Sequence, residues 1–212
     1  MKLIFAPLGE FIYSFLITNN MIQILLTALM WMFTPIPWIV STIHVLIKNN
    51  GWRASHAKAA VYLVSTVVWA ILAWWLKFNY QILFEQHFSI SVSIFFGIAL
   101  LVLAAVIEIV TAQAIGRKRI LGSSEFEKSQ DKLITVGIYK YARHPRYVEH
   151  PLWFVGLGLT FGYTSMLWFA LYLFIALAIT AHFEEQELIK RYSEGYLKYK
   201  KRTPAFFIGG KN

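Results

Sequence analysis

The sequence predicts an all-α integral membrane protein with about five transmembrane helices. Of its 212 residues, 58% are hydrophobic and only 15% are charged, whereas soluble domains carry about 25% charged residues. The apolar residues form runs long enough to cross a bilayer as helices. Because no internal repeat or low-complexity tract divides the chain, we expect residues 1–212 to form a single membrane domain.

The polar residues limit the classes of partner and chemistry. The formal net charge is +9, but the charges lie in short stretches between apolar runs. Anionic lipid headgroups lie at that level of a membrane, so we expect these headgroups as partners and no nucleic acid. The chain has no cysteine, which excludes disulfides and thiolate metal sites. The apolar stretch at 3–17 is short and broken, and we expect a mature chain with an interfacial segment there.

The apolar runs place the helices. The five predicted spans are residues 21–47, 57–76, 92–114, 148–161 and 165–183. Pro35 and Pro37 lie in the middle of the first run and should kink or loosen that helix, because proline donates no backbone hydrogen bond. The last two runs are separated only by Gly162, Tyr163 and Thr164, which predicts a tight helical hairpin.

The positive charges orient the spans. The connections at 48–58 and 115–147 and the C-terminal tail hold nearly all the lysines and arginines, whereas residues 77–91 hold Lys77 alone. The positive-inside rule therefore places these three segments in the cytoplasm. The segment from Glu184 to Asn212 is basic, with tyrosines at helical spacing, and predicts an amphipathic cytoplasmic helix on the headgroups.

Two titratable residues lie inside predicted spans. Glu108 interrupts the third span and is either a functional carboxylate or a group that bonds another helix or reaches toward Arg117. His44 lies near the end of the first span and is either a packing residue or a ligand-binding one. Sequence alone leaves both pairs of alternatives open.

The densest cluster of polar and aromatic residues is GIYKYARHPRYVEHPLW, residues 137–153. Its cationic and titratable residues are Lys140, Arg143, His144 and Arg146, and they alternate with tyrosines. Such a mixture suits a pocket at the membrane edge, where arginine binds a carboxylate with two hydrogen bonds and tyrosine rings stack on a planar or cationic ligand. A juxtamembrane basic patch within an aromatic belt is the alternative.

A second motif, FEEQELIKRYSEGYLKYKKRTPAF, follows the predicted hairpin. The ordered pair of motifs resembles the integral-membrane methyltransferases of the isoprenylcysteine carboxyl methyltransferase family, which is related to the phospholipid methyltransferases. That family has a Gly-x-Tyr-x-x-x-Arg-His-Pro-x-Tyr stretch before a hairpin, and a Glu-Glu pair and Tyr-x-x-Tyr after it. The resemblance covers residues 131–207, which we expect to be the cofactor-binding catalytic half.

The resemblance implies that S-adenosylmethionine binds on the cytoplasmic side and leaves as S-adenosylhomocysteine. It also implies methyl transfer to a lipophilic acceptor from the bilayer, such as an isoprenylcysteine carboxylate or a lipid, and no metal. The residues that it assigns to cofactor binding are Tyr139, Lys140, Arg143, His144, Pro145, Tyr147, Glu184, Glu185, Tyr196 and Tyr199.

The candidate catalytic residues are Arg143, Arg202, Glu149 and His150. Arg143 could hold the carboxylate of the cofactor, and Arg202 or Arg146 could hold a carboxylate acceptor. If the acceptor is an amine or a thiol, Glu149, His150 or Glu108 could take its proton. Many relatives have glycine two residues after the motif tyrosine, where this chain has Glu149.

Two other functions fit parts of the sequence. An NADPH-dependent membrane reductase of the sterol reductase type has a similar Arg-His-Pro-x-Tyr stretch, often continued by Gly-Glu, which Glu149 faintly matches. A non-catalytic scaffold or small transporter would leave the clustering of arginine, histidine and glutamate unexplained. The identity of the acceptor and the oligomeric state stay open.

Overall fold

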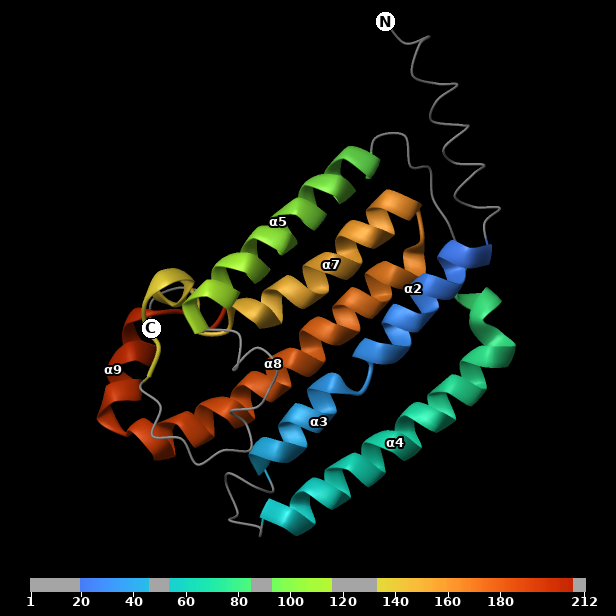
Figure 1. Ribbon diagram of the computed structural model, residues 1–212. Helices are drawn as coiled ribbons and strands as arrows, with labels where there is room; N and C mark the ends of the chain where they lie inside the picture. Colours follow the sequence, from blue (N-terminus) through green and yellow to red (C-terminus); the bar gives the residue numbers. More distant parts are fainter. Residues whose placement is uncertain (1–19, 46–53, 85–92, 116–132, 208–212) are drawn as a thin grey trace, which may run out of the picture.

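The computed structural model describes residues 20–45, 54–84, 93–115 and 133–207 (Figure 1). Within these ranges the chain forms helices and turns, with no β-strand. The helices are α2 (Asn20–Phe33), α3 (Ile36–Thr42), α4 (Ala54–Asn79), η2 (Tyr80–Phe84), α5 (Ser93–Ile115), η4 (Gly137–Lys140), α7 (Pro145–Phe161), α8 (Thr164–Tyr192) and α9 (Glu194–Arg202). The predicted interfacial segment at 3–17 lies outside the described residues.

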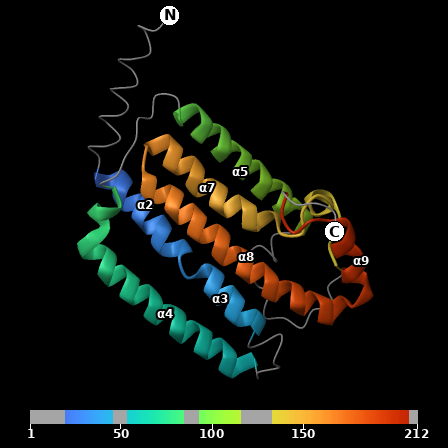
Figure 2. The same cartoon turned by 180° about the vertical axis from the view of Figure 1, so that it is seen from behind.

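The long helices lie side by side in one bundle (Figures 1 and 2). Helix α7 lies between α5 and α8, the pair α2–α3 packs on α8, and α4 is outermost. The short helix α9 turns across the end of the bundle where α7 begins. The buried apolar cluster joins α2, η2, α7 and α8, and its members include Leu26, Phe84, Phe154, Tyr163, Phe169 and Leu173.

Four stretches of the described chain are long and apolar enough to cross a membrane. They are Met21–Val45, Leu63–Phe84, Ser93–Ile115 and Thr164–Tyr192. Helix α7 has 17 residues and is therefore about 25 Å long, slightly less than the apolar thickness of a bilayer. It runs between two of those stretches. The predicted all-helical membrane fold with about five helices is confirmed.

The expected proline kink divides the first span into α2 and α3. Thr34 donates its backbone N–H to Met30 over 3.0 Å, and Pro35 then caps α3 while Pro37 occupies its first turn. Proline is well tolerated there because the first N–H groups of a helix have no intrahelical acceptor. The Tyr172 hydroxyl donates to the carbonyl of Thr34 at 2.6 Å, so α8 holds the break in place.

The boundaries around the hairpin differ from the predicted ones. Helix α7 begins at Pro145 rather than at 148, and α8 continues to Tyr192 rather than ending at 183. The prediction of a separate amphipathic helix that begins at Glu184 is therefore wrong, because only Glu194–Arg202 forms a separate helix, α9. Residues 184–192 contain no glycine or proline and are rich in helix-favouring residues, so the helix continues through the change in polarity. Ser193, with φ of 49°, makes the bend into α9.

Helices α5 and α7 approach closely because both carry glycine at their contact. A Cβ atom on Gly97 would lie 2.7 Å from the backbone nitrogen of Thr160 and 2.8 Å from the carbonyl oxygen of Gly156. Both neighbours are backbone atoms and cannot turn aside, so alanine would have to push the two helices apart.

The substitution Gly97→Ala should therefore destabilise the protein by about 1–3 kcal/mol, measured as a lower unfolding midpoint in detergent. Gly195→Ala is the matched control, because a Cβ atom on Gly195 would meet nothing within 4 Å. Equal midpoints for the two variants would show that the close contact of α5 and α7 has no energetic weight.

Candidate active site

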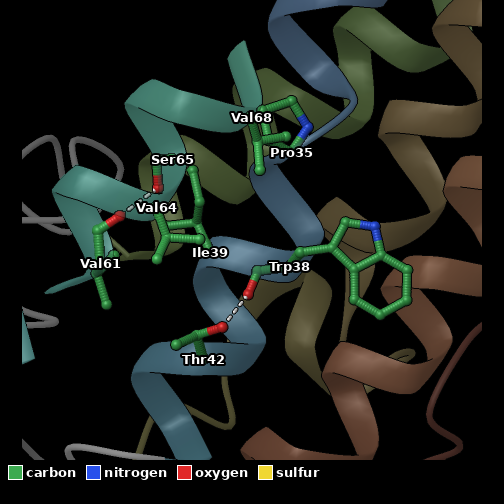
Figure 3. A pocket seen from close by; sticks show the side chains of 8 residues that line it. All are labelled: Pro35, Trp38, Ile39, Thr42, Val61, Val64, Ser65 and Val68. Atoms are coloured by element: carbon green, nitrogen blue, oxygen red, sulfur yellow. Dashed lines mark hydrogen bonds between the residues drawn. The ribbon is translucent and has the colours of Figure 1, made fainter. Parts of the chain in front are cut away.

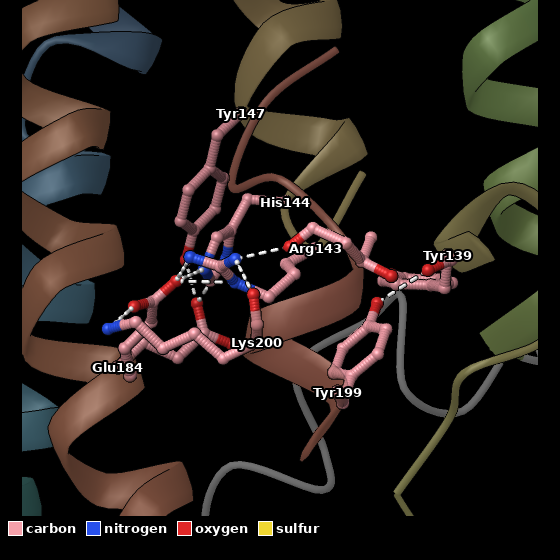
Figure 4. A network of polar contacts seen from close by, with 9 residues as sticks. Tyr139, Arg143, His144, Tyr147, Glu184, Tyr199 and Lys200 are labelled. Atoms are coloured by element: carbon pink, nitrogen blue, oxygen red, sulfur yellow. Dashed lines mark hydrogen bonds and ion pairs between the residues drawn. The ribbon is translucent and has the colours of Figure 1, made fainter. Parts of the chain in front are cut away.

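Helix α7 begins at the Arg-His-Pro sequence, and this start positions the site. Proline disfavours the helical conformation in the residue before it, so His144 stays outside the helix, with φ of −126° and ψ of 62°. Pro145 occupies the first turn, where its missing N–H costs nothing. The side chains of Arg143 and His144 consequently leave the chain just before α7 and point toward α8 (Figure 4).

Arg143 forms a buried ion pair with Glu185 of α8. Its Nε and Nη2 atoms both donate to Glu185 Oε1, over 2.8 and 2.6 Å. The two side chains are only 8% and 10% exposed, so water screens the pair weakly. Lys200 of α9 adds a second cation, with its Nζ 2.7 Å from Glu185 Oε2 (Figure 4).

The same arginine holds the C-terminal segment that follows α9. Its Nη1 donates to the carbonyl oxygens of Lys200, at 3.2 Å, and Thr203. The backbone N–H groups of Arg143 and His144 donate to the carbonyls of Pro204 and Ala205, each over 2.9 Å. Segment 203–205 is therefore fixed against the start of α7 by both side-chain and backbone hydrogen bonds.

His144 lies between the two glutamates of α8. Its Nε2 is 3.2 Å from Glu185 Oε1, and its Nδ1 is 3.4 Å from Glu184 Oε2. Tyr147 stacks on the imidazole at 5.3 Å between ring centres and donates its hydroxyl to Glu184 Oε2 over 2.9 Å. Burial alone would lower the pKa of His144, but the hydrogen bonds and charges of Glu184 and Glu185 outweigh it and raise the pKa to about 9.

The tyrosines of α9 complete this end of the bundle. Tyr199 donates its hydroxyl to the carbonyl of Tyr139 over 2.6 Å, which ties α9 to the turn before α7. The Tyr196 hydroxyl is buried beside Arg143, although no contact that it makes in the described part of the chain has the geometry of a good hydrogen bond. Burial raises the pKa of both phenols, Tyr196 and Tyr199, so both stay protonated at neutral pH.

Glu149 and His150 lie further along α7, nearer the middle of the bundle. Glu149 is 2% exposed, and its Oε1 accepts from Trp153 Nε1 over 2.7 Å. Its Oε2 is 3.1 Å from His150 Nδ1, yet the angles are not those of a hydrogen bond, and neither atom has another partner among the described residues. The His150 ring packs edge-on against Phe33 at 5.4 Å.

The structure brings most of the predicted site residues together. Those that meet at the start of α7 are Tyr139, Arg143, His144, Pro145, Tyr147, Glu184, Glu185, Tyr196 and Tyr199. Lys140 is exposed, and so is Arg202, whose Nε donates to the Lys198 carbonyl of its own helix over 3.2 Å. The ion pairs of the cluster do not include either residue.

Three residues join the site without a clear sequence signal. Lys200 and Thr203 contact Arg143 or Glu185, but they lie in a tail with several similar lysines. His44 is 1% exposed with no hydrogen-bond partner for Nδ1 among the described residues, and it lies near Glu184. Glu108, by contrast, is on the exposed side of α5.

A separate apolar groove lies between α3 and α4 (Figure 3). Its volume is about 190 Å³, and it is lined by Pro35, Trp38, Ile39, Thr42, Val61, Val64, Ser65 and Val68. The hydroxyls of Thr42 and Ser65 donate to carbonyls of their own helices, at 2.7 and 2.6 Å. The groove therefore suits an alkyl chain and offers little to a charged ligand.

Comparisons with known proteins bear on the family of the chain. The family model described as phospholipid methyltransferase matches residues 92–195, about half of the chain. A relative from the fission yeast Schizosaccharomyces pombe, protein-S-isoprenylcysteine O-methyltransferase, is 38% identical over 76 residues. This match spans 34% of the chain and 31% of the relative, so the chain covers about a third of that relative's length. No solved structure matches the chain significantly.

Both matches are to membrane methyltransferase families, and the helical membrane bundle is consistent with that class of protein. The chain belongs to the family of isoprenylcysteine carboxyl methyltransferase-like and phospholipid methyltransferase proteins. The family membership predicted from the two sequence motifs is confirmed.

The buried ion pair should dominate the stability of this end of the bundle. Arg143→Met should lower the free energy of unfolding by about 3 kcal/mol, because it leaves a buried carboxylate with one fewer partner and releases segment 203–205. Arg202→Met, on the exposed face of α9, should change it by less than about 0.5 kcal/mol. Comparable losses in chemical unfolding would contradict the special position of Arg143.

The raised pKa of His144 predicts how stability depends on pH. The folded protein holds the imidazolium more tightly than the unfolded chain, whose histidine titrates near 6.5. The contribution of His144 to the free energy of unfolding is therefore fully present below about pH 6.5 and is lost as pH rises through about 9. Unfolding midpoints between pH 6 and pH 9.5 should fall in the wild type and fall less in His144→Gln. His182→Gln, at an exposed position, should keep the wild-type slope.

Proposed function

We propose that the chain transfers a methyl group from S-adenosylmethionine to a lipophilic acceptor at the cytoplasmic face of the membrane. The observation that carries this proposal is the cluster of Glu184, Tyr147 and His144 at one end of a membrane bundle, in a chain of the methyltransferase family. The yeast relative is named for methylation of isoprenylcysteine. For this chain, the acceptor classes that we consider are an isoprenylcysteine carboxylate and a lipid.

The residues at this end fit the chemistry of the methyl donor. S-adenosylmethionine carries an ammonium, a sulfonium, a carboxylate, a ribose and an adenine. The Glu184 side chain is 25% exposed and can accept from the ammonium or the ribose hydroxyls. The buried Nδ1 of His44 lacks a hydrogen-bond partner among the described residues, as expected of an atom that binds a ligand.

Arg143 enters this proposal as a positioning residue. Its guanidinium already serves Glu185 and the carbonyls of Lys200 and Thr203. A direct clamp on the carboxylate of the cofactor, as the sequence suggested, would require one of these partners to move. We therefore assign the ligand contacts to Glu184 and Tyr147 and the rigidity of the site to Arg143.

The bound donor supplies an electrophilic methyl group on a sulfonium. The protein's part is to align donor and acceptor and to exclude water, because an in-line displacement gains most from proximity and a dry site. The apolar groove between α3 and α4 suits the chain of a lipophilic acceptor. Because Lys and Arg concentrate in the segments at the α9 end, the positive-inside rule supports a cytoplasmic site.

Calorimetric titration of the purified protein in detergent tests this function. S-adenosylmethionine and S-adenosylhomocysteine should bind, and NADPH should not. Glu184→Gln should weaken binding about 10- to 100-fold, because it removes a charge-assisted hydrogen bond. Glu187→Gln is the control on the same helix. The Glu187 carboxylate lies 3.7 Å from Arg191 Nη1, and no ion pair among the described residues joins it to the Glu184 cluster.

Binding of NADPH alone would replace the proposal with the reductase alternative. If folded wild-type protein binds none of the three compounds, the methyltransferase function itself is contradicted. Equal affinities for the Glu184 and Glu187 variants would remove Glu184 from the cofactor site while leaving the reaction class intact.

A further inference from the structure

The pair formed by Glu149 and His150 is a feature that cofactor binding does not explain. Glu149 is a carboxylate 2% exposed inside a membrane bundle, and half of its accepting capacity is unused among the described residues. A buried polar group without a partner costs about 1–3 kcal/mol, and more if it is charged. Such a group persists in a folded protein chiefly where function requires it.

Three contacts define the geometry of this pair. The Trp153 indole fixes Glu149 by donating to Oε1 over 2.7 Å. The other carboxylate oxygen, Oε2, then lies 3.1 Å from Nδ1 of His150. Phe33 fixes the plane of the imidazole through an edge-on contact at 5.4 Å. The His150 side chain is 16% exposed against 2% for Glu149, so the imidazole is the more accessible member.

The pair also lies along α7 between the proposed cofactor site and the apolar core. His150 follows Tyr147 by three residues on α7, which places it about 4.5 Å deeper along the helix axis. Tyr147 contacts Glu184 at the proposed cofactor site, whereas His150 and Phe154 contact Phe33 in the apolar core. A lipophilic acceptor that approaches the methyl donor along this side of α7 would lie beside this imidazole.

Resting on the proposed function, we propose that His150 takes a proton from the methyl acceptor and that Glu149 positions and stabilises its imidazole. The acceptor is then a lipophilic nucleophile that carries a proton, an amine or a thiol. In the amine case, the nitrogen lone pair forms the new C–N bond while the C–S bond breaks and its electron pair stays on sulfur. The proton leaves nitrogen for the His150 ring, and Glu149 balances the resulting charge.

The charged surroundings of His150 are limited. Helix α8 brings Glu184 toward α7 through Tyr147, and His44 lies near the same carboxylate. The described residues that α5 buries in the bundle are Gly97, Ala104, Ile107 and Thr111, none of which is titratable. Phe33 of α2 is apolar, and half-buried Arg146 precedes His150 by one turn of α7. Glu149 is therefore the carboxylate nearest to the imidazole among these groups.

Three matched probes test this inference: dodecylamine, dodecanethiol and S-dodecyl-N-acetylcysteine, which offers a carboxylate. Transfer of a labelled methyl group from S-adenosylmethionine should reach the amine or the thiol and not the carboxylate. His150→Gln should lower kcat at least about 100-fold, with KM and cofactor affinity little changed. Glu149→Gln should lower kcat similarly and leave KM little changed, because it removes the group that positions the imidazole and balances its charge.

A second readout needs no turnover. With S-adenosylhomocysteine bound, dodecylamine should protect His150 from modification by diethyl pyrocarbonate, and dodecanoate should not. Exposed His182 serves as the internal reference for the modification. For the effect of Glu149→Gln on kcat, Glu108→Gln is the matched control, because Glu108 lies on the outer side of α5. Methylation of the carboxylate probe alone, an unchanged kcat in His150→Gln, or equal protection by amine and carboxylate would each overturn the inference. If the wild-type protein does not bind S-adenosylmethionine or S-adenosylhomocysteine, the proposed function itself is contradicted.

Discussion

The ion pair between Arg143 and Glu185 is the interaction on which this end of the protein depends. It joins the start of α7 to α8, and the same guanidinium holds the carbonyls of Lys200 and Thr203. The start of α7, the end of α8 and the segment after α9 are thereby fixed around one buried cation. Because charge-assisted hydrogen bonds are strong where water is excluded, this contact also fixes the surroundings of the adjacent Glu184.

The remainder of the bundle places this polar end against an apolar interior. Helices α5 and α7 pack closely through Gly97 and Gly156, and α3 is anchored on α8 where Ser41 and Thr180 share a hydrogen bond of 2.9 Å. That anchor lies about one turn from Glu184 on α8 and about one turn from His44, which follows the end of α3. The polar cluster and the lipid-facing surface therefore meet within a few helical turns, as the proposed methyl transfer to a lipophilic acceptor requires.

Much of the fold was predictable from sequence. Long apolar runs and the Pro35–Pro37 break gave the helices, and two ordered motifs gave the family. Helix ends were less predictable, because hydropathy marks the change in polarity at Glu184 and not the backbone bend at Ser193. The motifs also identified Arg143 and Glu185 without revealing that the two bind each other, since that contact depends on how α7 and α8 pack. Lys200 was indistinguishable from neighbouring lysines for the same reason.

The central claim is that the cluster at the start of α7 binds the methyl donor. An experimental structure of the protein with S-adenosylhomocysteine tests it most directly. The account predicts the amino end of the ligand within hydrogen-bond distance of Glu184, with Tyr147 beside it and the Arg143–Glu185 pair intact. Ligand density in the groove between α3 and α4, or anywhere away from Glu184, would contradict it.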